Sequence, residues 1–212
     1  MDTVRVSPRA SYAAAIYYGG KMDTVERASG AARWTLDLNP MTSHPTNLGT
    51  FFNETETVFV VFDRSSKMDI VVFDAAGGRV LGRVSGNAGT PLAVSADTRL
   101  LVAGRYDPSL TGENYRLEIY DVATGKLVRE LGHDDSLPGT FSFSPDGKRI
   151  AGSYRTTTVR LWDVETAEVL GTLAGHSVAV VASAFHPGGK VLASASVCGA
   201  SIGPNPSVFF FQ

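Results

Sequence analysis

The sequence predicts an all-β chain, and three observations support that prediction. Short runs of β-branched and aromatic residues alternate with turns rich in Gly, Pro, Asp and Asn. No stretch of about a dozen residues places apolar side chains at helical spacing between capping signals. Two kinds of segment also recur at a nearly constant spacing, which indicates tandem copies of one sheet unit.

The first recurring segment is an aromatic residue followed by aspartate, a turn and a new strand. Its copies read FDAAGGRVL at residues 73–81, YDVATGKLV at 120–128 and WDVETAEVL at 162–170. Asp74 and Asp121 lie 47 residues apart, and Asp121 and Asp163 lie 42 apart. A weaker copy is expected at Leu36-Asp37, 37 residues before Asp74.

The second recurring segment is a turn unit in which Pro or Gly favours the turn backbone. It reads FSPDGK at residues 143–148, FHPGGK at 185–190 and, more faintly, VSADTR at 94–99. Phe143 and Phe185 are 42 residues apart, so two independent markers share one period. The extra residues of the longer period fall in a loop at 107–114. A period of about 40 to 45 residues with about four strands per unit is typical of β-propeller blades.

Residues 132–163 resemble a complete WD repeat. The matching parts are Gly132-His133, then 141–148, IAGS at 150–153 and VRLWD at 159–163. A second copy runs from Gly175-His176 to Ser196, and the best match covers about residues 115–196. The resemblance implies a single propeller domain with blades at about residues 1–44, 45–84, 85–131, 132–173 and 174–212. Because the family most often has seven blades, a closed ring, an incomplete ring and part of a longer bacterial-type repeat protein all remain open.

The C-terminal tail has two interpretations. Residues 207–212 align with 158–163, so Phe211 takes the position of the tryptophan and Gln212 that of the aspartate, after a loop that begins at Cys198. Alternatively, the tail has no native partner. On both interpretations the last blade lacks its outer strand, and the family's mode of closure makes residues 3–6 the expected donor. An open ring would expose strand edges and self-associate.

Composition and motifs argue against several functions. Lys and Arg number 19 against 21 Asp and Glu, which leaves a net charge of -2 and little attraction for nucleic acid. No apolar run approaches the roughly 20 residues of a membrane span, so we expect no membrane contact. The single cysteine, Cys198, excludes an internal disulfide and suits a cytoplasmic location. No histidine pair, nucleophile elbow or phosphate loop is found, so we expect no metal, no cofactor and no enzyme activity.

The resemblance also assigns roles to particular residues. In the family, a Gly-His histidine, a strand serine, a turn aspartate and the tryptophan form a buried hydrogen-bonded set, which implies His133, Ser153 and Trp162 here. Arg155 stands where the turn aspartate is expected, so this set is incomplete. Family loops on one rim of the propeller contact partners. The residues expected on that rim are Arg105, Tyr106, His133, Asp134, Tyr154, Arg155 and His176.

The leading hypothesis is a non-catalytic scaffold that binds a protein or peptide through these rim loops. One alternative is a docking or sensor segment of a longer regulatory protein, which a contiguous regulatory domain in the same reading frame would support. A less favoured alternative is a propeller hydrolase or oxidoreductase with a metal or cofactor in a central channel. That alternative requires inward-facing carboxylates or histidines, and the sequence does not supply a convergent set.

Overall fold

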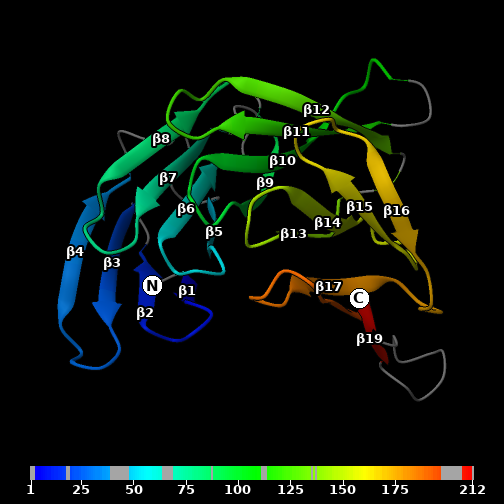
Figure 1. Ribbon diagram of the computed structural model, residues 1–212. Helices are drawn as coiled ribbons and strands as arrows, with labels where there is room; N and C mark the ends of the chain where they lie inside the picture. Colours follow the sequence, from blue (N-terminus) through cyan, green and yellow to red (C-terminus); the bar gives the residue numbers. More distant parts are fainter. Residues whose placement is uncertain are drawn as a thin grey trace. The chain divides into compact units, whose positions relative to one another are not determined.

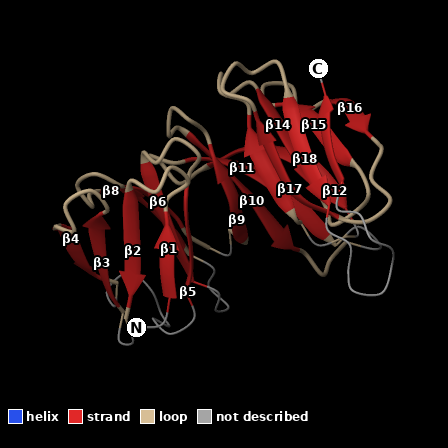
Figure 2. Cartoon of the chain, turned by 90° about the horizontal axis from the view of Figure 1, so that it is seen from below, coloured by secondary structure: helices blue, strands red, loops and turns tan. Residues whose placement is uncertain are grey.

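The computed structural model describes residues 3–17, 20–38, 48–63, 69–86, 88–110, 114–134, 136, 138–196 and 207–211. Within these ranges every regular element is a β-strand, and the strands form five antiparallel sheets (Figure 1 and Figure 2). Four sheets have four strands and the fifth has three. The predicted all-β class is therefore confirmed. The same ranges contain no helix that could cross a membrane.

Contacts divide the chain into two compact units, and the first comprises Met1–Pro91 and Tyr120–Lys126. Each of its two sheets runs in chain order from first to fourth strand. The first sheet contains β1 (Thr3–Val6), β2 (Tyr12–Ile16), β3 (Lys21–Glu26) and β4 (Ala32–Asp37). The second contains β5 (Leu48–Phe52), β6 (Val58–Asp63), β7 (Ile70–Asp74) and β8 (Val80–Val84).

The second unit comprises Leu92–Ile119 and Leu127–Gln212 and holds most of the remaining three sheets. The third sheet contains β9 (Thr90–Val94), β10 (Leu100–Tyr106), β11 (Tyr115–Asp121) and β12 (Leu127–Asp134). The fourth contains β13 (Thr140–Phe143), β14 (Arg149–Ser153), β15 (Val159–Asp163) and β16 (Val169–Leu173). The fifth contains β17 (Val180–Phe185), β18 (Leu192–Ser196) and β19 (Ser207–Phe211).

Every sheet uses the same tight turn, the inner turn, between its first and second strands. The inner turns span residues 7–10, 53–56, 95–98, 144–147 and 186–189. In each, the N–H of the fourth residue donates to the carbonyl of the first, and the fourth residue has a positive φ. Glycine at 147 and 189 adopts this backbone without a Cβ clash, which is why the predicted FSPDGK and FHPGGK units mark these turns.

Two predictions for the N-terminal region are wrong. Residues 3–6 do not complete the last sheet; they form β1, in which Thr3 lies opposite Ile16, because the inner turn at 7–10 folds them back onto β2. Leu36-Asp37 does not mark the end of the third strand, because it ends the outer, fourth strand β4. Glu26 takes that position, and its N–H donates to the Ala31 carbonyl at 3.0 Å.

A second repeated turn, the outer turn, joins the third and fourth strands at residues 26–30, 74–78, 121–125 and 163–167. The predicted marker aspartates hold three of these turns together. Asp74 Oδ1 accepts the N–H of Ala76, and the same atom of Asp121 and of Asp163 accepts the N–H of Thr124 and of Thr166. Each aspartate satisfies turn N–H groups that the strand ladder leaves unpaired, so its role is structural.

In the first unit, the outer turns at 74–78 and 121–125 each pack on the outer strand of the preceding sheet. The indole N–H of Trp34 in β4 donates to the Ala75 carbonyl at 3.0 Å. Gly82 in β8 has the register position of Trp34, since each lies opposite the residue just before a β-bulge. A Cβ on Gly82 would overlap the Val122 carbonyl of the next outer turn. The contact is therefore close enough to require glycine.

The fourth sheet's outer turn follows the same pattern within the second unit. Val164 and Ala167 pack against a core cluster that includes Leu131 of β12. The cluster centres on Trp162, whose ring is 1% exposed and stacks on Phe141 with a centroid distance of 5.9 Å. The aromatic residue of the WD pair is thus a core residue.

The tail forms the third strand of the last sheet. β19 pairs with β18 so that Phe211 lies opposite Leu192, just as Trp162 lies opposite Ile150. Cys198 and Gln212 lie outside the described residues. The strand alignment predicted for the tail is therefore present in the structure.

His176 ties the segment before β17 to the last sheet. Its Nε2 lies 2.7 Å from Ser194 Oγ and its Nδ1 lies 3.0 Å from Ser196 Oγ. The ring also meets the Phe209 ring at 90°, with a centroid distance of 4.6 Å. Burial lowers the pKa of His176 because the charged imidazolium loses hydration.

Replacing Trp162 by alanine should lower the free energy of unfolding by about 3 to 5 kcal/mol, because a large aromatic side chain leaves a packed core. Leu127→Ala is the control, since Leu127 is 53% exposed and should change stability by less than about 0.5 kcal/mol. Urea unfolding monitored by far-UV circular dichroism measures both. A change below about 1 kcal/mol for Trp162→Ala would contradict the packing described.

The outer-turn contact predicts different effects on stability when alanine replaces two glycines that share one register position, Gly82 and Gly171. Gly82→Ala should destabilise the protein by about 1 to 3 kcal/mol, because the new methyl group overlaps the Val122 carbonyl. Gly171→Ala in β16 should be neutral within about 0.5 kcal/mol, because nothing lies within 4 Å of its Cβ position. If the Gly82→Ala and Gly171→Ala variants were equally stable in thermal and urea unfolding, the outer turn would not pack closely against β8.

The buried imidazole predicts a loss of stability at acid pH. The folded state binds a proton at His176 less readily than the unfolded chain does, so stability should fall as pH drops below the ordinary histidine pKa of about 6.5. His176→Gln should reduce the difference between urea unfolding at about pH 7.5 and about pH 5.5. The exposed His186, changed to Gln, is the control and should leave that difference intact. An unchanged pH dependence in His176→Gln would refute the assignment.

Candidate functional site

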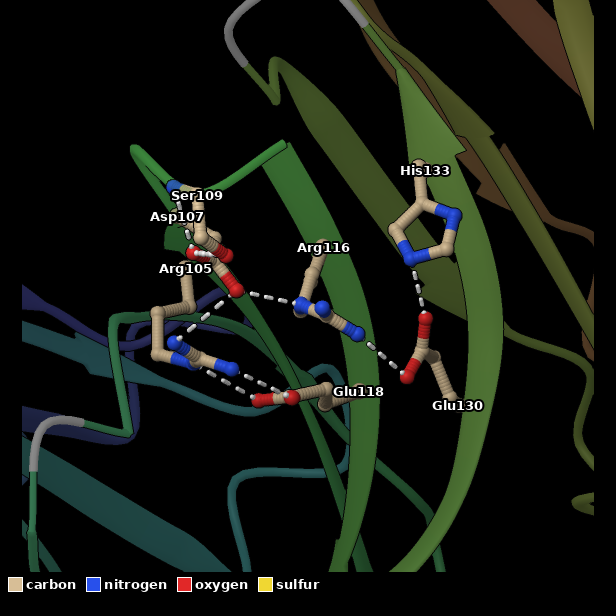
Figure 3. Close-up of polar contacts among 7 residues, drawn as sticks. All are labelled: Arg105, Asp107, Ser109, Arg116, Glu118, Glu130 and His133. Atoms are coloured by element: carbon tan, nitrogen blue, oxygen red, sulfur yellow. Dashed lines mark hydrogen bonds and ion pairs between the residues drawn. The ribbon is translucent and has the colours of Figure 1, made fainter. Parts of the chain in front are cut away.

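The most polar constellation in the second unit is a chain of ion pairs across β10, β11 and β12 (Figure 3). It starts at Glu118, whose carboxylate accepts from Arg105 Nη2 at 3.1 Å and from Nε at 3.4 Å. Because Glu118 is only 5% exposed, this two-point pairing compensates a buried charge. We call the six linked groups the charged ladder: Glu118, Arg105, Asp107, Arg116, Glu130 and His133.

Asp107 and Glu130 connect the remaining members of the charged ladder. Arg116 Nε donates to Asp107 Oδ2 at 2.6 Å, and its Nη1 donates to Glu130 Oε2 at 2.9 Å. Glu130 Oε1 lies 2.5 Å from His133 Nε2. Hydrogen bonds from Ser109 and Arg116 hold the pKa of Asp107 well below its usual range. The ladder thus anchors the start of the loop after β10 to the two following strands.

The expected rim residues of the third sheet lie at or beside this ladder. Arg105 and His133 are members of it, while Asp134 pairs with Arg160 at 3.5 Å. Tyr106 is 52% exposed, and its ring meets Tyr115 edge-on at a centroid distance of 5.4 Å. Arg155 is exposed and has a φ of 59° in the turn after β14. Tyr106 and Arg155 therefore present the most accessible side chains of the expected set.

Two expected rim residues are core residues instead. Tyr154 is 3% exposed, because its ring packs edge-on against Phe141 and Trp162. His176 is 7% exposed, and both of its ring nitrogens lie within hydrogen-bonding distance of serine hydroxyls. Neither side chain is available to a partner in this structure.

The three residues expected to form one hydrogen-bonded set, His133, Ser153 and Trp162, make other contacts in the structure. Ser153 Oγ donates to the Thr156 carbonyl at 3.4 Å, and His133 pairs with Glu130. Trp162 lies in the aromatic cluster with Phe141. Their assembly into one set stays a prediction. A buried histidine and serine set does form one repeat later, around His176.

Sequence reasoning missed most of the charged ladder. Arg105 and Asp107 are two residues apart in the chain, with Asp107 directly after the end of β10, and Arg116 and Glu118 share one face of β11. Opposite charges at this spacing on consecutive strands were the available signal. Among the described residues no group of three or more His, Cys, Asp or Glu side chains could hold a metal ion.

Two segments match the family model "WD domain, G-beta repeat", at residues 125–163 and 167–200. "WD repeat and SOCS box-containing protein 1" of Danio rerio is 33% identical over 101 residues, which cover 47% of this chain and 22% of that protein. "WD repeat-containing protein VIP3" of Arabidopsis thaliana is 24% identical over 180 residues, or 79% of this chain and 50% of that protein. The chain thus spans half or less of the length of these relatives.

The solved structures support the same architecture. The computationally designed Ika8 protein superposes with a TM-score of 0.64 over 91% of this chain and 54% of its own, at 18% sequence identity. At this identity the likeness concerns the fold alone. Residues 125–163 and 167–200 are therefore similar to WD repeats, and the five described sheets are consistent with an incomplete propeller of such repeats.

Proposed function

We propose that the chain is a protein-interaction scaffold whose binding surface includes Tyr106 and Arg155. Proteins with WD repeats are generally non-catalytic scaffolds, and the names of both relatives above include WD repeats. The observation that carries the finer proposal is the charged ladder, which fixes the strand ends next to Tyr106. We call Tyr106 and Arg155, with the charged ladder whose members Arg105 and Asp107 flank Tyr106 in the chain, the rim surface.

The charged ladder supports binding because it lowers the conformational entropy that the surface loses when a partner docks. Loop side chains that are already held lose less conformational entropy when a partner docks. Tyr and Arg are favoured anchors because each combines a large contact area with directed hydrogen bonds. A partner that is a protein or a peptide suits these side chains, and the net charge of -2 gives a phosphate backbone little attraction.

Tyr106 is a sharper test of this proposal than Arg105. Removing the Arg105 guanidinium would take two hydrogen bonds from the buried Glu118 carboxylate, so lost binding in that variant would report lost structure. Tyr106 has an exposed ring, and its removal leaves the ladder intact. Leu127 offers a matched control, because its exposed fraction is close to that of Tyr106. It lies at the start of β12, whereas His133 of the charged ladder lies near the end of that strand.

Peptides selected from a phage-displayed random library on the wild-type chain should bind Tyr106→Ala or Arg155→Ala at least about tenfold more weakly. They should bind Leu127→Ala with unchanged affinity, measured by fluorescence anisotropy. Unfolding curves of the variants should match the wild type. Selected peptides that bind all three variants equally would place the interaction surface elsewhere and overturn the proposal.

A further inference from the structure

We propose that the rim surface binds a polypeptide segment through an acidic side chain, whose carboxylate pairs with Arg155. The proposal rests on the proposed function, because it names the chemistry of the partner that the same surface selects. Three features of the second unit support it: the fixed backbone around Arg155, a guanidinium without an ion pair among the described residues, and a second guanidinium from Arg160.

Hydrogen bonds fix the turn after β14 on both sides of Arg155. Before it, the N–H of Gly139 donates to the Ser153 carbonyl at 2.8 Å. After it, the N–H of Val180 donates to the Thr156 carbonyl at 2.9 Å. Arg155 itself has a φ of 59°, in the left-handed region that glycine adopts more easily than any residue with a Cβ. The backbone therefore favours glycine here, and a role for the arginine has to come from its side chain.

The aliphatic part of the Arg155 side chain packs on the backbone of residue 139. Its Cγ lies 3.3 Å from the position that a Cβ on Gly139 would occupy. The residue as a whole is nevertheless exposed. Arginine commonly packs its stem in this way while its charged head stays in water. A stem that is already held lowers the conformational entropy that the side chain loses when a partner binds.

Arg155 differs from the neighbouring arginines of the second unit in its ion pairs. Arg105, Arg116 and Arg160 each pair with a carboxylate. Within the part of the chain that the structure describes, no carboxylate pairs with Arg155. Asp134 is already engaged, because its Oδ2 lies 3.5 Å from Arg160 Nη2. The Arg155 guanidinium is therefore open to a carboxylate from a partner.

Arg160 brings a second guanidinium to the same end of the fourth sheet. It is the second residue of β15, which follows the turn that contains Arg155. Its Cζ lies 5.7 Å from the centroid of the Tyr154 ring and 5.8 Å from that of Trp162, so two aromatic rings hold the group in place. Two guanidinium groups against the single Asp134 carboxylate leave an excess of positive charge in this group of described side chains. That excess attracts an anionic group at close range.

A carboxylate suits this position because a guanidinium can donate two parallel hydrogen bonds to its two oxygens. Tyr106 supplies aromatic contact area for the rest of the bound segment. An ion pair that stays exposed to water adds little affinity, whereas a pair that the docked segment shields from water couples more strongly. We therefore expect a measurable coupling between the acidic side chain and Arg155.

Two phage-displayed libraries of equal peptide length test this chemistry, one encoding all residue types and one without Asp and Glu. We expect the wild-type chain to select its tightest binders from the first library. A selected peptide is then made in two forms, as selected and with its Asp or Glu changed to Asn or Gln, and both forms are titrated into the full chain by fluorescence anisotropy. The amide form should bind the wild type at least about fivefold more weakly.

Variants of the chain locate the carboxylate. Arg155→Gln should bind the two peptide forms with equal affinity, because the carboxylate has then lost its partner. Arg99→Gln is the matched control, since it removes the same charge from an exposed arginine directly before β10, and it should discriminate between the forms as the wild type does. Arg155→Glu should reverse the preference and favour a peptide with Lys at the acidic position. Unfolding curves of these variants should match the wild type, because each changes an exposed side chain.

Two results would overturn the proposal: equally tight binders from the library without Asp and Glu, or an equal loss of affinity by the amide form on the wild type and on Arg155→Gln. In both cases, selected peptides that bind Tyr106→Ala and Arg155→Ala weakly would leave the proposed function standing. Peptides that bind those two variants as tightly as the wild type, or libraries that yield no binder, would contradict the proposed function and this proposal together.

Discussion

The fold depends on the contact between each outer turn and the outer strand of the sheet before it. A single sheet of this kind has two apolar faces and cannot bury both, so it requires neighbours. The close approach of the Val122 carbonyl to Gly82 and the hydrogen bond from Trp34 to Ala75 show two chemical solutions to the same contact. One uses a glycine to admit the turn, and the other uses an indole to bind it. The aspartate after each aromatic residue shapes the turn that makes this contact possible.

The charged ladder lies on strands of the third sheet, and its side chains are not part of the apolar core. Its ion pairs are partly exposed, and pairs of that kind add little to stability at the surface. Their effect is geometric, because Asp107 joins the loop after β10 to β11 and Glu130 joins β11 to β12. Apolar side chains between the sheets therefore maintain the fold, and the charged ladder sets the geometry of polar strand ends in the third sheet.

Much of the fold was predictable because its turns use distinctive residues. Asp121 and Asp163, with glycine at 147 and 189, mark backbone geometry that few residues satisfy, and Phe211 could be aligned with Trp162 from spacing alone. The outer turn of the first sheet was misplaced because Glu26 stands where the other sheets have aspartate after an aromatic residue. Burial was harder to predict than register. Tyr154 follows a strand in a turn, which resembles an exposed site, yet its ring fills the space beside Trp162. The ladder was missed because it depends on which strands are neighbours.

Hydrogen exchange measured by mass spectrometry on the 212-residue chain tests the central claim most directly, because β8 and β16 are both outer strands and a described outer turn lies over Gly82 of β8 but not over Gly171 of β16. Amides protected by packing open with higher free energy than amides on an uncovered strand. The account predicts that peptides from β8 exchange at least about tenfold more slowly than peptides from β16, while β7 and β15 remain similarly protected. Equal exchange in β8 and β16 would contradict it, since the outer turns would then contribute nothing to the stability of the sheets they cover.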